Sequence, residues 1–440
     1  METFLIKALQ LILALSLLVI IHELGHFLWA KLFKIRVEKF YLFFNPWFSL
    51  FKWKPKNSET TYGVGWLPLG GYVKIAGMID ESMDKEQMAR EPQPWEFRSK
   101  PAWQRLLVMT GGVINNFILA IIIYAGIAWY WGEKSIPYSN AYEGMDFTPA
   151  AQALGFRNGD ILLTADGNLI DSSERQNLYN MLNAKEVKVL RNHKDTVTLH
   201  MPADAITRLP QDDPFMAYRT PVFVKKVMNG EPAAQAGLQV GDRIVQVGDS
   251  LTPAYTEFVP ALIAYAGKPT ALKVVRDGKE IELEATPTEA GKLGFGLMSL
   301  LEVFDCVTVD YNIFEAIPRG VSNGTGMLVT YVSSLKHVFT KEGAQSIGGF
   351  GAIGDLFPEK WNWRTFWEMT AFLSIILAFM NIIPIPALDG GHVMFLLWEV
   401  VTRRKPSEKF MEYAQMAGMF LLLALLIYAN TNDIYRFFIK

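Results

Sequence analysis

The sequence HELGH at residues 22–26 strongly restricts the possible folds, because it lies in an apolar run over residues 3–29. A helix of roughly 20 apolar residues spans a bilayer, so this run predicts a membrane helix. Titratable groups at membrane depth are costly and usually functional. Residues four apart share one face of a helix, so His22 and His26 can bind one metal ion. Glu23 beside them can take a proton from a water molecule, which predicts a catalytic metal site.

Three further apolar segments are long enough to cross a membrane, residues 106–130, 369–388 and 413–430. Half of the chain is hydrophobic and the mean hydropathy is +0.16, which is more apolar than a soluble protein of this length needs. The formal net charge of −2 gives no indication of a nucleic-acid partner. We therefore predict a polytopic α-helical protein with about four transmembrane helices in a lipid bilayer. A cleaved signal peptide is a poorer interpretation of the first segment, because HELGH would be discarded with it.

Lysine and arginine near the spans predict the orientation of the chain. Residues 31–105 and the loop between the third and fourth spans are rich in these residues, whereas the short flanks on the other side are not. The first and third loops are therefore predicted to be cytoplasmic. The long segment 131–368 and both termini are predicted to lie outside the cytoplasm.

A metal ion held by two histidines needs a third ligand, and residues 381–392, NIIPIPALDGGH, contain the candidate. Two prolines break the helix there, and irregular backbone at membrane depth is tolerated only where it is buried or lines a wet cavity. The two glycines after Asp389 permit a tight turn. We predict Asp389 as the third ligand, because two histidines and a carboxylate with an open position form a catalytic zinc arrangement.

Other interpretations of residues 381–392 stay open at this point. Asp389 could cap a following helix over residues 392–400. His392 is a rival third ligand. Asn381 could hydrogen-bond a substrate backbone or an oxyanion, or it could satisfy a carbonyl group freed by Pro384.

The long segment contains a repeat, with TPAAQALGFRNGDILLTADG at residues 148–167 and EPAAQAGLQVGDRIVQVGDS at residues 231–250. Each copy has a helix-like AAQA turn, a glycine, a Gly-Asp turn and an apolar alternating strand. The pattern resembles the core of a bacterial PDZ domain, which predicts two inserted α/β PDZ domains at residues 131–220 and 221–308. PDZ domains bind extended peptides at a sheet edge, although a steric filter or spacer explains the repeat as well.

The order of these features resembles the site-2 protease family of intramembrane zinc metalloproteases, over the whole chain. HExxH stands in the first span, the PDZ tandem follows, and NxxPxPxLDGGH ends the third span. The resemblance implies that Zn²⁺ is bound by His22, His26 and Asp389, with Glu23 as the catalytic base.

The resemblance also implies a class of substrate and a location. The family implies cleavage of single-pass membrane proteins, such as anti-sigma factors, after a first cut by a site-1 protease, and removal of remnant signal peptides. It implies the bacterial inner membrane, with the PDZ domains and both termini outside the cytoplasm. The distribution of lysine and arginine predicts the same polarity.

Residues 61–78, TYGVGWLPLGGYVKIAGM, are rich in glycine and β-forming residues and predict a short sheet or hairpin. A helical substrate hides its carbonyl groups, so an unpaired edge strand near the zinc could hold it unwound. The family resemblance implies such a membrane-associated β-loop, at Gly70, Gly71, Tyr72 and Val73. An ordinary surface hairpin is the alternative.

Two asparagines within the second span, Asn115 and Asn116, indicate either hydrogen bonding between helices or closeness to the polar site. The single cysteine, Cys306, excludes an intrachain disulfide. Two other classes of protein compete with the protease, a membrane-anchored PDZ scaffold and a metal transporter. The scaffold does not explain HELGH, and the transporter does not explain the repeat.

The predicted division of the chain is residues 1–130 with two spans and the β-loop, the PDZ domains 131–220 and 221–308, an extracytoplasmic amphipathic segment 309–365, and the last two spans 366–440.

Overall fold

The computed structural model of the chain describes residues 2–68, 70–78, 91–170, 180–202, 204–205, 215–339 and 348–435. Contacts between residues divide the chain into two compact units. One unit is formed by Met1–Gly132 together with Asp310–Lys440, and the other by Glu133–Val309. Each unit has hydrophobic clusters of its own.

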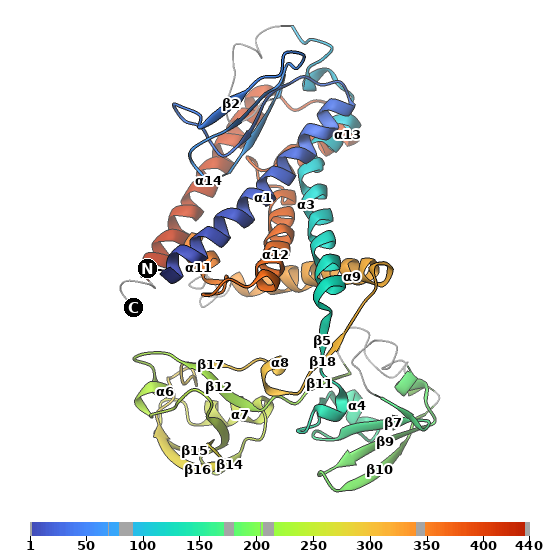
Figure 1. Cartoon of the computed structure of the whole chain (residues 1–440), viewed down its shortest axis with the longest axis vertical. Helices are drawn as coiled ribbons and strands as arrows, with labels where there is room; N and C mark the ends of the chain where they lie inside the picture. The colour runs from blue at the N-terminus through green and yellow to red at the C-terminus, as the bar shows by residue number, and fades with distance from the viewer. Residues whose placement is uncertain are drawn as a thin grey trace. The chain divides into compact units, whose positions relative to one another are not determined.

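The first unit is built on long apolar helices (Figure 1). Within the described residues, four helices are long and apolar enough to cross a membrane, which agrees with the predicted number. They are α1 (Glu2–Leu32), α3 (Ala102–Trp131), α12 (Trp363–Ile382) and α14 (Glu408–Ile434). Helix α3 packs against both α1 and α12, so the first and third spans are joined through the second.

The third span differs from the apolar run 369–388 that the sequence predicts. Helix α12 ends at Ile382, and the chain is irregular until α13 (Asp389–Thr402) begins. Pro384 and Pro386 explain the early end, because a proline has no N–H to donate and its ring clashes with the preceding turn. Hydropathy alone does not detect this break, since the residues after it are still apolar.

A small sheet belongs to the first unit. Its strands are β1 (Val37–Leu42), β2 (Phe51–Trp53), β3 (Thr61–Val64) and β4 (Tyr72–Ile75). Their order is β2-β3-β1-β4, with β1 parallel to β3 and antiparallel to β4. Because β1 lies between β3 and β4, residues 61–78 do not form a hairpin, and that alternative is wrong. Among the described residues, β4 is an edge strand of this sheet.

Two more helices complete the first unit, α9 (Ile313–Ser334) and the short α11 (Phe350–Asp355). Helix α9 lies across α3 and α12 (Figure 1). A Cβ atom at Gly320 of α9 would lie 2.6 Å from the Ile121 carbonyl oxygen of α3, so the two helices approach closely. Phe314 on α9 is 81% exposed.

The second unit consists of two α/β halves. The first half contains β5 (Glu133–Ser135), β6 (Met145–Phe147), α4 (Pro149–Ala153), β7 (Ile161–Ala165), β8 (Asn168–Leu169), β9 (Glu186–Arg191), β10 (Asp195–His200) and β11 (Met216–Tyr218). The second contains β12 (Val222–Val227), α6 (Pro232–Gln235), β13 (Arg243–Val247), β14 (Ser250–Leu251), α7 (Tyr255–Ala264), β15 (Thr270–Arg276), β16 (Lys279–Ala285), β17 (Phe295–Leu297), α8 (Leu300–Val303) and β18 (Val307–Val309). Strands β5 and β18 pair, which joins the start and the end of this unit.

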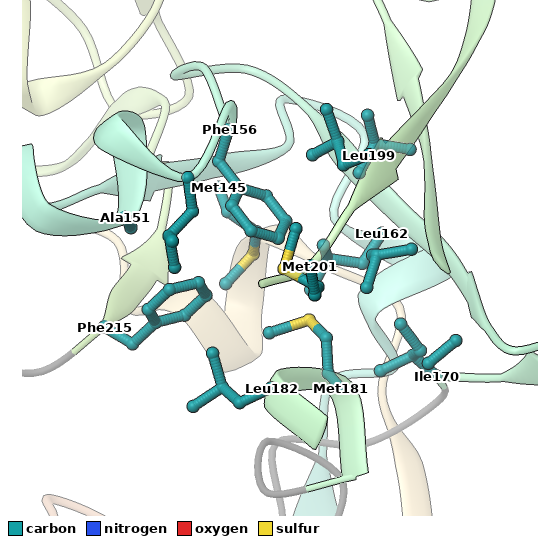
Figure 2. Packing of buried hydrophobic residues seen from close by; sticks show 14 of the residues in the cluster. Met145, Ala151, Phe156, Leu162, Ile170, Met181, Leu182, Leu199, Met201 and Phe215 are labelled. Carbon is teal, nitrogen blue, oxygen red and sulfur yellow. The ribbon is translucent and has the colours of Figure 1, made fainter. Parts of the chain in front are cut away.

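Each half buries its own hydrophobic core. In the first half, Phe156, Leu162 and Met181 are almost completely buried, and Figure 2 shows their side chains converging between the strands and the short helices. The sheet there has the order β10-β9-β7-β8, and the second half has β16-β15-β13-β12-β17. The two halves therefore have separate cores rather than one shared core.

The same ion-pair network occurs in both halves. In the first, Arg191 Nε donates to Asp160 Oδ1 at 2.8 Å, and the Arg157 backbone N–H donates to the same carboxylate. In the second, Arg276 Nε donates to Asp242 Oδ1 at 2.7 Å. The Asp of each Gly-Asp turn thus ties that turn to a strand. The repeat seen in the sequence is a repeat of structure.

Candidate metal centre

Three potential ligand atoms from two distant parts of the chain meet in the first unit. His22 Nε2 lies 3.1 Å from Asp389 Oδ2, and His26 Nε2 lies 3.3 Å from the same oxygen. The two histidine Nε2 atoms are 3.2 Å apart. His22 and His26 are on α1, and Asp389 is the first residue of α13. Of the described residues, these three form the cluster that could hold a metal ion.

The dimensions of this triangle fit a zinc ion. Tetrahedral zinc with bonds of about 2.0–2.2 Å holds neighbouring ligand atoms roughly 3.3–3.5 Å apart. The separations here are 3.1–3.3 Å, and two imidazoles with one carboxylate are a zinc donor set. Asp389 Oδ2 is buried and accepts no hydrogen bond within the described chain, which leaves it available for a metal ion. The residues present therefore fit Zn²⁺.

The turn before Asp389 is formed differently from the prediction. The positive φ, +80°, belongs to Ala387, whereas Gly390 and Gly391 lie in the first turn of α13. These glycines are required by close packing instead. A Cβ atom on Gly390 would lie 2.1 Å from the Ile383 carbonyl oxygen, and one on Gly391 would lie 2.7 Å from the Ile385 oxygen. The glycines thus let the start of α13 fold back on the irregular segment and bring Asp389 to the histidines.

Helix α3 packs closely against the part of α1 that carries the two histidines. A Cβ atom on Gly112 would lie within 2.7 Å of ring atoms of both His22 and His26. One step along α3, a Cβ atom on Gly111 would lie 2.7 Å from the Gly25 carbonyl oxygen. Glycines at a contact between membrane helices allow their backbones to approach closely. Sequence reasoning missed Gly111 and Gly112, although a glycine pair within an apolar span was an available signal.

A cavity of about 440 Å³ opens beside the three ligands. It is lined by the three candidate ligands, by Glu23, by Gly71 and by the edge strand β4, including Tyr72 and Val73. Glu23 and Val73 both line this cavity. The structure therefore places the predicted base, the predicted ligands and most of the predicted β-loop residues around one space.

Two of the predicted substrate-binding residues, Asn381 and Gly70, are not among the residues that line the cavity. Asn381, in the last turn of α12, has its Nδ2 atom 3.4 Å from His22 Nε2, so it lies at the metal centre. Gly70 precedes β4 and is not among the residues lining the cavity. The side chain of Tyr72 stacks on Tyr41, and its hydroxyl donates to Asn45 Oδ1.

The other polar residues singled out in the sequence have different surroundings. His392 Nε2 is 2.8 Å from Gln415 Nε2 on α14 and lies outside the ligand triangle. Asn116 is fully buried, and its Nδ2 atom is 3.3 Å from His22 Nδ1. Asn115 donates to the Ile21 carbonyl oxygen at 3.4 Å. One asparagine is thus near the active site, and the other links two helices.

Two histidines and an adjacent glutamate on a helix that can span a membrane, together with an aspartate from α13, are typical of a membrane zinc metalloprotease. The comparison with known families agrees. Residues 10–425 match the model of peptidase family M50, and the chain belongs to this family. It is a multi-pass protein of the bacterial inner membrane and a zinc metalloprotease with a site-2 protease role in regulated intramembrane proteolysis.

Three curated relatives cover nearly the whole chain. The regulator of sigma E protease of Haemophilus influenzae is 28% identical over 97% of this chain and 98% of its own length. The regulator of sigma-E protease RseP of Salmonella typhimurium is 28% identical, with 97% of each chain covered. The metalloprotease MmpA of Caulobacter vibrioides is 27% identical over 99% of this chain and 96% of its own length. The whole chain therefore resembles proteases of the RseP type.

Proposed function

We propose that this protein cuts the transmembrane segments of single-pass membrane proteins, including anti-sigma factors or remnant signal peptides. A site-1 protease would trim these substrates first. The observation that carries the proposal is the cavity that joins the three ligands, Glu23 and the edge of β4. A protease that works on a helix needs a metal centre, a base and a surface that holds the substrate extended. All three line the same space.

We assign zinc to His22, His26 and Asp389. When bound, zinc supplies Lewis acidity, which activates a water molecule and polarises the scissile carbonyl group. Glu23 extends from the same turn of α1 as His22 and His26, and it lines the cavity where a peptide would lie. Its carboxylate takes the proton of the attacking water and passes it to the leaving amine. Val73 of β4 lines the same cavity, so a substrate bound along β4 would lie beside this carboxylate.

The edge of β4 is the proposed substrate-holding surface. An unwound segment can add to a sheet edge through backbone hydrogen bonds, which is a common way to bind extended peptides. Gly71 and Val73 contribute through their backbones, and Gly70 leads the chain into this strand. A Cβ atom added to Gly71 would lie 2.7 Å from the Tyr41 carbonyl oxygen. This close packing fixes the path of the chain as it enters β4. Asn381, beside His22, is placed to bind the carbonyl oxygen of the scissile bond.

The two halves of the second unit are, in this proposal, PDZ domains spanning residues 131–220 and 221–308. The repeated Asp–Arg network supports one origin for both. These domains and both termini lie outside the cytoplasm, and segment 309–365 lies on the extracytoplasmic face of the inner membrane. Cys306 is the one cysteine of the chain and is partly exposed. Labelling of Cys306 by a membrane-impermeant maleimide in spheroplasts tests this orientation, and protection until lysis would contradict it.

Glu23→Gln separates catalysis from metal binding. The amide keeps the shape of the side chain but cannot take a proton, so zinc content stays near that of the wild type and cleavage falls by about 10²–10⁴-fold. The assay uses purified full chain and a single-pass model substrate, with zinc measured on the same samples. Cleavage by Glu23→Gln at the wild-type rate would show that another group is the base. A wild-type chain that binds no zinc would refute the metal site.

A further inference from the structure

Helix α3 contacts both metal-binding histidines through their second ring nitrogens. His26 Nδ1 lies 2.8 Å from the Val108 carbonyl oxygen. His22 Nδ1 lies 3.3 Å from the amide of Asn116. A carbonyl oxygen can only accept, so His26 Nδ1 carries its proton and His26 Nε2 presents a lone pair. His22 needs the same arrangement, because its Nε2 faces Asp389.

A neutral imidazole that binds metal through Nε2 carries its proton on Nδ1, and that proton needs an acceptor. Asn116 is the side chain in position to supply one. It is fully buried, and its Oδ1 atom has no hydrogen-bond partner within the described residues. Rotation about the Cβ–Cγ bond exchanges Oδ1 and Nδ2 in nearly the same space. In that orientation the amide oxygen accepts the Nδ1 proton of His22.

We propose that Asn116 is a positioning residue that holds His22 in the tautomer whose Nε2 binds zinc. This inference rests on the proposed metal site and adds a residue that supports it. Asn116 is neither one of the three candidate ligands nor a residue that lines the cavity, so it acts through His22. Its effect is on the affinity for zinc and on the protonation pattern of one imidazole.

The position of Asn116 is itself fixed by a second helix. The buried hydroxyl of Ser374 on α12 donates to the backbone carbonyl oxygen of Asn116 at 2.7 Å. Helix α12 carries Asn381 and leads to Asp389. The contact between Ser374 and Asn116 therefore links the helix that supports His22 to the segment that supplies the third ligand. Asn115 shows the contrast: its side chain links α3 to α1 through the Ile21 carbonyl oxygen and has no hydrogen bond to an imidazole among the described residues. A role in helix packing alone would not require Asn116 to face His22.

The test compares zinc affinity in purified full-length variants by competition with a chelator. Asn116→Leu has similar size but no acceptor, and we expect zinc affinity to fall by about 10–100-fold, as is typical for a lost partner of a metal-binding histidine. Asn116→Asp keeps an acceptor and should hold zinc within a few-fold of the wild type. Asn115→Leu is the matched control on the same helix, and it should also bind zinc normally. Unchanged affinity in Asn116→Leu, or an equal loss in Asn115→Leu, would overturn the proposal.

A measurement on the wild type does not depend on whether a variant folds. In zinc-loaded protein with ¹⁵N-labelled histidine, the His22 signals, assigned by loss in His22→Gln, should show a protonated Nδ1 and a metal-bound Nε2. Zinc on Nδ1, or an unprotonated Nδ1, would refute the role of Asn116 while leaving the protease proposal intact. Failure of the wild type to bind zinc at all would refute the metal site and this inference together.

Discussion

Gly112 on α3 lies against the imidazole of His22, so closely that a Cβ atom there would be 2.6 Å from the Cε1 atom of that ring. The same Cβ atom would be 2.7 Å from His26 Nε2. The two histidines therefore hold their positions only because the residue behind them has no side chain. The shape of the metal site depends on a residue that cannot bind metal.

Gly112→Ala should weaken zinc binding. An added methyl group in a closely packed site costs about 1–3 kcal/mol, which corresponds to roughly 5–150-fold in affinity if the cost falls on the zinc-bound site. Zinc affinity is measured by chelator competition. Gly126→Ala is the control, because a Cβ atom at Gly126 of the same helix meets nothing within 4 Å. Equal zinc affinity in Gly112→Ala and Gly126→Ala would mean that α3 shifts to accommodate the methyl group without displacing His22 and His26.

Asp389→Ala and His392→Ala decide which residue is the third ligand. Asp389 Oδ2 is 3.1 Å from His22 Nε2, whereas His392 faces Gln415. We expect Asp389→Ala to lower zinc from about one ion per chain to a small fraction, since a catalytic site needs three protein ligands. His392→Ala should keep its zinc. Metal analysis after dialysis against a weak chelator gives the result, and the reverse pattern would make His392 the ligand.

Val73→Pro tests the edge strand. Proline removes the N–H of a residue that lines the cavity, and prolines are tolerated on a sheet edge where the N–H points outward. We expect kcat/KM for a single-pass substrate to fall roughly 10–100-fold, as for the loss of a hydrogen bond worth about 1–3 kcal/mol. Val73→Ala keeps the N–H and should remain active. If both variants cleave equally well with normal zinc content, β4 does not contribute through this backbone group.

Asp242 should make the second unit sensitive to acid. Burial alone would raise the pKa of Asp242, but hydrogen bonds from Arg276 and from the Gln239 N–H hold it below its usual value. A carboxyl group whose pKa is lowered by folding stabilises the fold above its unfolded pKa of about 3.9, and this contribution is lost as pH falls through the lower, folded value. Protection from unfolding should therefore decline in that acidic range.

Asp242→Asn should remove this contribution already at neutral pH. Hydrogen–deuterium exchange of β13 and β15 in the full chain would be faster than in the wild type, because the strands lose the tie to Arg276. Asp277→Asn, in the exposed turn between β15 and β16, is the control and should exchange like the wild type. Exchange in Asp242→Asn that matches this control would show that the ion pair does not stabilise the unit.

Sequence reasoning succeeded where the signal lies within one element or one short motif. The apolar runs located four spans, and the spacing of His22 and His26 placed both rings on one face of a helix. The proline pair indicated a break but not its position, because residues on both sides are apolar. The tight turn was assigned to the wrong residue, since the sequence does not show that Ala387 takes the positive φ and that Gly390 is needed for packing.

The sequence by itself determined the spans, the HELGH helix and the repeat, because these follow from hydropathy and from the regular geometry of a helix or strand. The tertiary structure decided which distant groups meet. It brought Asp389 to the histidines, set β4 rather than a hairpin beside Glu23, and placed Val108 and Asn116 behind the two rings. These contacts depend on how helices pack and on backbone carbonyl groups, which every residue possesses and which no sequence pattern distinguishes.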